Sequence, residues 1–242
     1  MQRLKIRLGN FFFRYRNALF PVAFMFALMA GRPEHALGTR ESDAIVDKLG
    51  FAVAMIGQSL RVATIGFEYI VRGGKDHQVH ADTLVQGGIF AHCRNPLYVG
   101  NLLIVFGLAL VIHSRAFYLI FIPFILLVYT TIVAAEEAYL HDKFGAEYDL
   151  YCSRVPRWRL RLRGLVASVR PMRFNWQRVL VKEYNTTFAL MAALVGLSMW
   201  SDFRVLGPGA LPQRGAIVVG ALLWAGLYFA VRTAKKSGYL RG

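Results

Sequence analysis

Long apolar segments separated by short, charged connections dominate the 242-residue chain. Each segment is close to the roughly 20 residues that a helix needs to cross the hydrocarbon core of a bilayer. They lie at 11–30, 44–70, 96–113, 116–138, 184–200 and 214–231. An open strand could not satisfy its backbone hydrogen bonds in lipid, so all of them are predicted to be helices. The pattern predicts an all-α, polytopic membrane helix bundle with about six transmembrane helices.

Basic residues are distributed unevenly between alternate connections. With the N-terminus placed in the cytoplasm, 22 of the 29 Lys and Arg residues fall on the cytoplasmic side and five on the opposite side. Cytoplasmic loops of membrane proteins carry such an excess of basic residues. An odd number of spans would destroy the asymmetry. The sequence therefore predicts a multi-pass integral membrane protein with both termini in the cytoplasm.

The composition agrees with this reading, because 56% of the residues are hydrophobic and 14% are aromatic. The net charge of +15 would suggest nucleic acid as a partner, but the positive charge lies between the spans, so no nucleic acid is expected. Cys93 and Cys152 lack the spacing of a disulfide framework or a zinc site, and no metal site is predicted. The basic, apolar N-terminal segment has no small-residue cleavage site and is interpreted as a retained anchor.

The segment 154–178 alternates arginines with leucines and aromatic residues. Nucleic-acid binding is one interpretation of such a pattern. The favoured interpretation is an interfacial stretch that lies on anionic lipid headgroups with its aromatic side chains at the membrane surface.

The stretch from Thr83 to Gly100 joins a polar cluster directly to an apolar helix. Asn95 and Pro96 predict a helix start, because Asn is a favoured N-cap and Pro is tolerated at the first helical position. The free N–H groups of that start attract anions, and Arg94 beside it adds a fixed positive charge. Tyr98, about one turn into the helix, brings a hydroxyl to the same region. The alternative is an ordinary capped helix whose arginine reaches lipid phosphate.

Glu136 and Glu137 follow about twenty uncharged residues at the predicted inner end of the fourth span. Adjacent carboxylates so close to hydrocarbon usually face a cavity or a partner. The alternative is that the helix ends there and both are solvated. The following segment, rich in aromatic and polar residues, is predicted to fold back on the first motif. A cytoplasmic cofactor pocket is expected between loop 71–95 and this segment.

These stretches together resemble the isoprenylcysteine carboxyl methyltransferase family and its bacterial relatives, which overlap with the membrane phospholipid methyltransferases. The family pattern has a Leu-Val turn with a glycine and an aromatic residue, an R-H-P-x-Y-x-G element, a Glu pair, F-G-x-x-Y-x-x-Y and V-P-R/T. The corresponding stretches here are GQSLRVA at 57–63, LVQGGIF at 84–90, RNPLYVG at 94–100, Glu136–Glu137, FGAEYDLY at 144–151 and VPR at 155–157.

The resemblance implies a methyltransferase that uses S-adenosyl-L-methionine to methylate a lipophilic acceptor. Glu136 and Arg94 would be catalytic, and Arg61 and Glu137 are the candidates for substrate contact. A pairing of Arg61 with Glu68, on the same helix face, is the alternative for that arginine. The implied cofactor-binding residues are Thr83, Leu84, Val85, Phe90, Asn95, Pro96, Leu97, Tyr98 and Glu136.

The chain departs from the family pattern at two positions. Asn95 replaces the motif histidine, and an amide can donate a hydrogen bond but cannot titrate. Ile132 stands where the eukaryotic enzymes have an arginine one turn before the Glu pair. The resemblance therefore does not fix the methyl acceptor, nor whether oxygen, sulfur or nitrogen is methylated. No general base stands out among His77, His80 and His92.

The predicted organisation has four parts. These are an N-terminal anchor with the start of the second span (1–56), a methyltransferase core (57–157), a basic interfacial segment (158–182) and two extra C-terminal transmembrane helices (183–242). The last part has no predicted mechanistic role and is a candidate homodimer face.

Two other functions are alternatives to the methyltransferase. An NADPH-dependent membrane reductase of the sterol-reductase type has a similar motif, but Leu97 and Asn101 stand where those proteins tend to have Asn and Glu. A transporter or non-enzymatic scaffold is poorly supported, because Arg61 and Glu68 are the only plausible intramembrane charges.

Overall fold

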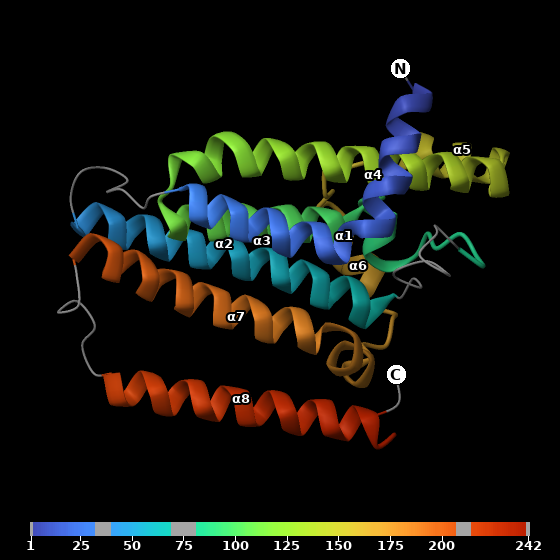
Figure 1. Cartoon of the computed structure of the whole chain (residues 1–242). Coiled ribbons are helices and arrows are strands. Elements are labelled where there is room, and N and C mark those ends of the chain that lie inside the picture. The colour runs from blue at the N-terminus through green and yellow to red at the C-terminus, as the bar shows by residue number, and fades with distance from the viewer. Residues whose placement is uncertain (1, 32–39, 69–80, 207–213, 241–242) are drawn as a thin grey trace.

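The computed structural model describes residues 2–31, 40–68, 81–206 and 214–240, and every regular element in these ranges is a helix (Figure 1). The all-α prediction is confirmed for this part of the chain. The elements are α1 (Gln2–Ala30), α2 (Arg40–Phe67), the 3-10 turn η1 (Gly88–Ala91), α3 (Pro96–Ile112), the π-helical turn η2 (Phe117–Phe121), α4 (Ile122–Phe144), α5 (Ala146–Arg154), α6 (Leu165–Val169), α7 (Trp176–Leu206) and α8 (Arg214–Lys236).

Glycines bring α2 and α3 into backbone contact along their length. A Cβ atom added to Gly57 would lie 2.6 Å from the carbonyl oxygen of Gly100, and one added to Gly107 would lie 2.5 Å from that of Gly50. Small residues at helix interfaces allow this close approach, which drives helix association in membranes. The pair α2–α3 therefore forms a tightly packed centre for the bundle.

The helix α1 packs along α4. Gly9 is the point of closest approach, because a Cβ atom there would lie 2.0 Å from the carbonyl oxygen of Thr131. Further along, the rings of Phe20 and Tyr129 have their centroids 5.4 Å apart. Pro21 lies inside α1, where it removes one backbone hydrogen bond, and the helix bends (Figure 1).

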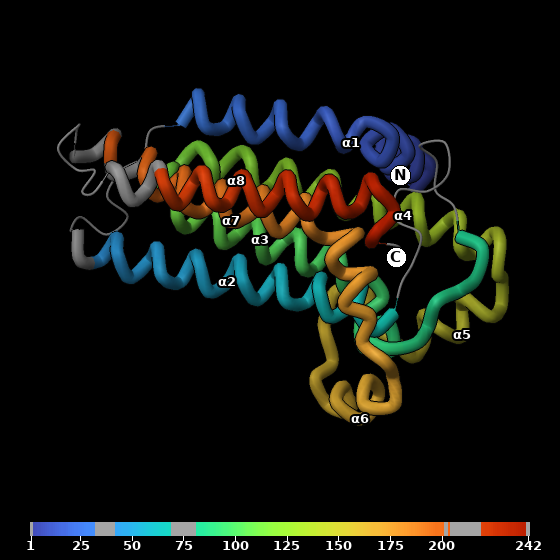
Figure 2. The backbone as a smooth tube through the Cα atoms, turned by 90° about the horizontal axis from the view of Figure 1, so that it is seen from below, coloured from blue at the N-terminus to red at the C-terminus, as the bar shows by residue number. Residues whose placement is uncertain are grey.

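The helix α7 packs on α2 and α3, and its Leu190, Leu194 and Leu197 complete the main hydrophobic core. The helix α8 lies outside α7, with the rings of Phe188 and Trp224 4.3 Å apart. In both views the start of α1 and the end of α8 lie at the same end of the bundle as α5 and α6 (Figures 1 and 2).

The predicted helices are all present, but their bounds differ from the predicted spans. Two helices are long and apolar enough to cross a membrane by length and composition, Ser42–Phe67 and Phe117–Phe144, and Pro96–Ile112 is a shorter apolar helix. The fourth helix does not end at 138 but continues to Phe144, so Glu136 and Glu137 lie inside it. The alternative that the helix ends at this pair is wrong, and the partners of the two carboxylates explain why.

Candidate active site

A cavity of ≈ 880 Å³ opens between α1, α3, α4, α7 and the loop before α3. This volume is within the range of small-molecule sites, which is about 300–1,000 Å³. The structure brings every predicted site residue to its wall. They are Arg61, Thr83, Leu84, Val85, Phe90, Arg94, Asn95, Pro96, Leu97, Tyr98, Glu136 and Glu137.

The loop before α3 turns through η1 and ends in the predicted helix start. Gly88 has a φ of +54°, a conformation that favours glycine. The start of α3 at Pro96 is confirmed, but the side chain of Asn95 does not cap it. Its Nδ2 instead donates to the carbonyl oxygen of Arg157 at 3.1 Å. The amide therefore joins the two motifs, and the N–H groups at the start of α3 keep no side-chain acceptor from Asn95.

The segment after α4 folds back against this loop, as predicted. Gly145, with a φ of +51°, joins α4 to α5. The backbone N–H of Arg94 donates to the carbonyl oxygen of Pro156 at 2.9 Å, and the hydroxyl of Tyr151 donates to that of Phe90 at 2.8 Å. Burial raises the pKa of Tyr151 far above its ordinary value, so the hydroxyl remains a donor.

Tyr98 and Glu136 meet across the cavity wall. The hydroxyl of Tyr98 donates to Oε1 of Glu136 at 2.7 Å, joining α3 to α4. Arg16 of α1 is close enough to attract both groups electrostatically. The carboxylate of Glu136 is thus held in the cavity by a neutral donor and a nearby cation.

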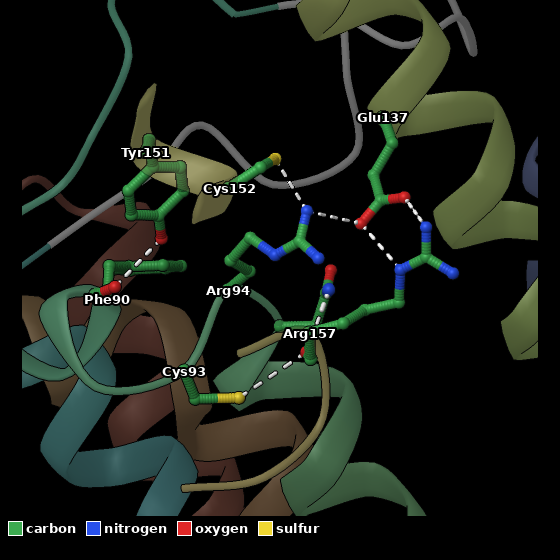
Figure 3. Close-up of polar contacts among 8 residues, drawn as sticks. Phe90, Cys93, Arg94, Glu137, Tyr151, Cys152 and Arg157 are labelled. Carbon is green, nitrogen blue, oxygen red and sulfur yellow. Dashed lines mark hydrogen bonds and ion pairs between the residues drawn. The ribbon is translucent and has the colours of Figure 1, made fainter. Parts of the chain in front are cut away.

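Arg94, Glu137 and Arg157 form a second cluster (Figure 3). Nη1 of Arg94 lies 3.1 Å from Oε1 of Glu137, and both side chains are 14% exposed. Arg157 donates from Nε to the same carboxylate at 2.8 Å and bonds it again through Nη2. Burial disfavours the charge of Arg94, but the carboxylate of Glu137 attracts it, and the pKa of Arg94 lies above its ordinary value. Two guanidinium groups share one carboxylate, so the cluster carries an excess positive charge.

One atom of this cluster has no partner within the protein. Nε of Arg94 is buried and makes no hydrogen bond in the described part of the chain, although Nη1 donates to Glu137 and to the sulfur of Cys152. A buried unsatisfied donor is costly. Other atoms of the same arginine line the cavity.

Arg61 is paired with a residue outside the predicted core. Its Nε donates to Oε2 of Glu183 at 3.0 Å and its Nη2 to Oε1 at 2.8 Å, and its Nη1 donates to Asn101. Pairing with Glu68 was the alternative prediction for this arginine, and it is wrong. Glu68 lies near the end of α2, with its carboxylate beside Gly87, whereas α7 brings Glu183 directly to Arg61.

A family model described as phospholipid methyltransferase matches residues 48–147. The cobalt-zinc-cadmium resistance protein CzcN of Cupriavidus metallidurans is 31% identical over 158 residues, which are 64% of this chain and 68% of the relative. Protein-S-isoprenylcysteine O-methyltransferase of Schizosaccharomyces pombe is 32% identical over 115 residues, which are 45% of this chain and 46% of that enzyme.

The chain belongs to the family of phospholipid and isoprenylcysteine methyltransferases. It spans less than half the length of the yeast enzyme that it matches. No solved structure matches it. The name of the bacterial relative refers to metal resistance. Within the described residues of this chain, no group of three or more His, Cys, Asp or Glu side chains could hold a metal ion.

Much of the cavity wall comes from helices outside the 100-residue family match. The motifs did not reveal these residues, since α1 precedes the match and α7 follows it. Polar residues inside apolar helices are the signal that could have found them, as such residues usually face a cavity or a partner. Those missed outside the match are Arg16 and Asn17 on α1 and Asn185 and Thr186 on α7, and those missed inside it are Asn101 on α3 and Tyr129 on α4.

The histidines take no part in the described cavity wall. His92 is buried, with Nδ1 2.9 Å from the carbonyl oxygen of Arg161 and Nε2 2.8 Å from Oγ of Ser168. It therefore fixes the segment around α6 to the motif loop. His77 and His80, with residues 71–80 of the predicted pocket loop, lie outside the described residues.

Proposed function

We propose that this protein is a multi-pass integral membrane methyltransferase that uses S-adenosyl-L-methionine to methylate a lipophilic acceptor. One observation carries the proposal. The family motifs, separated by about forty residues of apolar helix, meet at one cavity in which Tyr98 bonds Glu136 and Arg94 bonds Glu137.

The groups around the cavity fit the chemistry of this cofactor. Its carboxylate would be held by the unpartnered Nε of Arg94 and by the N-terminal end of α3, where the helix dipole favours negative charge. Its ammonium and sulfonium groups are cationic, and Glu136 is the carboxylate that would attract them. Thr83, Leu84, Val85 and Phe90 would enclose the adenosine. The same proposal gives Asn95, Pro96, Leu97 and Tyr98 the methionine end.

The cofactor supplies a methyl group that is already activated by its positively charged sulfur. In the proposed transfer, a bond would form from the acceptor heteroatom to the methyl carbon while the carbon–sulfur bond would break and its electrons would remain on sulfur. The positive charge of sulfur is lost in this step, so Glu136 contributes binding and orientation rather than transition-state stabilisation. In this proposal Glu136 would also take the proton that a hydroxyl or thiol acceptor releases. The larger contribution to the rate comes from alignment of the two reactants.

A membrane location is supported by the outer surface of the bundle. Large apolar side chains are exposed there, among them Val22, Phe26 and Met29 on α1, Leu119 on η2 and Leu223 on α8. Exposed apolar side chains of this size in such number are typical of a surface that contacts lipid. We propose that the long helices make six spans, and that the end of the bundle with α5, α6 and both termini faces the cytoplasm, as the excess of basic residues indicates.

The reductase alternative has no such support. The matching family model describes phospholipid methyltransferases, and one of the two relatives is named as an isoprenylcysteine methyltransferase. Lipid and protein partners remain proposals as well, with anionic headgroups at 154–178 and a homodimer through the C-terminal helices.

The test is calorimetric binding of S-adenosyl-L-methionine to the purified full-length protein in detergent. Glu136→Gln removes one negative charge from the cavity and leaves an oxygen to accept the Tyr98 hydrogen bond, so we expect affinity to fall at least tenfold. Asp142→Asn is the matched control, since this carboxylate lies on the same helix with 88% of its side chain exposed. Wild-type protein that is folded and binds no cofactor would overturn the proposal.

The methylated product is found in a second experiment. The protein is incubated with methyl-labelled S-adenosyl-L-methionine and total membrane lipid, and the labelled lipid is identified by mass spectrometry. Label recovered only in water-soluble products would contradict a lipophilic acceptor.

A further inference from the structure

Four polar side chains from four helices meet on the cavity side of the bundle, about one turn along α3 from Tyr98. We call this group the polar belt; its members are Arg61, Asn101, Tyr129 and Glu183. Arg61, Asn101 and Tyr129 line the cavity, and Glu183 lies behind Arg61. The side chain of Asn101 accepts a hydrogen bond from Nη1 of Arg61. The ring of Tyr129 lies 5.3 Å from that of Tyr98, centroid to centroid, so the belt adjoins a residue that we propose to hold the methionine end of the cofactor.

The charge of the belt is balanced internally. Arg61 is 6% exposed and Glu183 is 1% exposed, and two hydrogen bonds of 2.8 and 3.0 Å join them. Gln58 helps to hold the carboxylate, because its Nε2 lies 3.4 Å from Oε2 of Glu183 and 2.7 Å from Oγ1 of Thr187. The geometry is that of a bidentate, buried ion pair with no net charge.

This balance contrasts with the other arginine cluster of the cavity. At Arg94, two guanidinium groups share Glu137, and one N–H has no acceptor. That cluster can accept an added anion. At Arg61 the guanidinium charge is already neutralised by Glu183, so an added anion would find no balancing cation beside this buried pair. Burial of an uncompensated charge is strongly unfavourable, whereas an uncharged polar group needs only a hydrogen bond.

The cavity continues from the belt between apolar walls. Ile104 and Leu108 of α3 face the side of α7 that carries Ala189 and Ala193. Residues four apart share a helix face, so the two alanines leave a channel along α7. A chain of methylene or isoprenoid groups fits this part of the wall.

We propose that the methyl acceptor carries an uncharged polar head on an apolar tail, and that Glu183 sets this preference by neutralising Arg61. The inference rests on the proposed function and names the class of acceptor. The head hydrogen-bonds to Arg61, Asn101 or Tyr129, and the tail lies between α3 and α7. Glu183 acts as a positioning residue, because it shapes the charge of the belt and does not touch the acceptor. A free carboxylate is excluded from this place.

The test compares two probes with the same tail, hexadecan-1-ol and hexadecanoic acid. Binding of each labelled probe is measured at pH 9, where the carboxylic acid is ionised, to full-length protein in lipid nanodiscs with empty nanodiscs subtracted. All proteins compared, including the one that is wild type at positions 61 and 183, carry Arg94→Gln, because the Arg94 cluster of the same cavity would otherwise hold the acid. We expect wild-type protein to bind the alcohol at least tenfold more tightly than the acid. Glu183→Gln leaves Arg61 with an unbalanced charge, so this ratio should shift at least tenfold towards the acid.

Two further variants separate charge from structural damage. Arg61→Gln combined with Glu183→Gln removes both charges and should keep the wild-type preference. Arg61→Gln alone leaves Glu183 as an excess negative charge, so the preference for the alcohol should increase. If Glu183→Gln does not fold, this variant tests the effect of charge in its place. Wild-type protein that binds the acid as tightly as the alcohol, or a ratio that stays the same in both folded single variants, would overturn the proposal.

The readout needs no cofactor, so the two proposals can fail separately. If the protein binds no cofactor but shows the expected probe ratios, the methyltransferase proposal fails and the preference for an uncharged head group stands. Cofactor binding with reversed probe ratios would do the opposite.

Discussion

Replacing Tyr98 with phenylalanine removes one oxygen atom from the proposed site. In the wild type that hydroxyl donates to Oε1 of Glu136 at 2.7 Å, and the ring packs against Tyr129 with centroids 5.3 Å apart. The ring contact survives the substitution. The carboxylate of Glu136 keeps the attraction of Arg16 but loses the hydrogen bond that Tyr98 donates. The change therefore isolates the contribution of one charge-assisted hydrogen bond.

The magnitude follows from that bond. A hydrogen bond to a charged group contributes about 1.5–3 kcal/mol. If this bond orients Glu136 towards the cationic groups of the cofactor, Tyr98→Phe loses that amount of binding free energy. Since about 1.4 kcal/mol is a factor of ten, the dissociation constant for S-adenosyl-L-methionine should rise about ten- to hundredfold.

Isothermal titration calorimetry on detergent-purified protein measures this change directly. Tyr139→Phe is the matched control, because it makes the same chemical change on α4 and does not line the cavity. The control should bind the cofactor as the wild type does. A folded Tyr98→Phe protein whose dissociation constant stays within twofold of the wild-type value would refute the role given to this hydrogen bond.

Three further predictions concern packing, topology and lipid contact. Gly57→Val should destabilise the protein by about 1–3 kcal/mol through overpacking against Gly100, and thermal unfolding should show no comparable loss for Gly196→Val, where a Cβ atom meets nothing within 4 Å. In a background with both native cysteines replaced by serine, a membrane-impermeant maleimide should label Ser237→Cys in sealed inside-out vesicles, whereas labelling only in right-side-out vesicles would reverse the topology. Arg161→Gln with Arg163→Gln removes two exposed charges that flank the exposed Leu162. Each basic residue near the membrane contributes about 1 kcal/mol of attraction to anionic lipid, so the purified double variant should retain several-fold less phosphatidylglycerol, measured by lipid mass spectrometry. Unchanged retention would remove the headgroup contact.

The parts of the site that could be predicted from sequence are those encoded locally. Pro96 fixes the start of α3 because its ring suits the first helical position, and Tyr98 follows by one turn. Glu136 could be expected in a cavity since an apolar helix rarely carries a carboxylate without a partner. The two stretches, the start of α3 and the Glu pair of α4, are far apart along the chain, and only the resemblance to the family indicated that they meet.

The parts that were missed depend on contacts between distant helices. Arg61 was assigned a neighbour on its own helix, but its partner Glu183 lies 122 residues away in a helix that the motifs do not include. Asn95 was expected to cap α3 with its side-chain oxygen. Its Nδ2 instead donates to the carbonyl oxygen of Arg157, and in this orientation the side chain does not cap the helix. The length of α4 was underestimated because Tyr98, Arg94 and Arg157 compensate the Glu pair and allow the helix to continue. These contacts join residues far apart in sequence, so no local sequence pattern predicts them.

The pairing of Arg61 with Glu183 also bears on how the protein is made. In the proposed topology, Arg61 enters the bilayer with the second helix, and its counter-charge emerges from the ribosome only 122 residues later. During that interval the nascent chain holds a guanidinium in or near hydrocarbon, a state that is costly until it is compensated. The early helices therefore cannot reach their final packing before α7 is inserted, and assembly of the chamber is a late event in biogenesis.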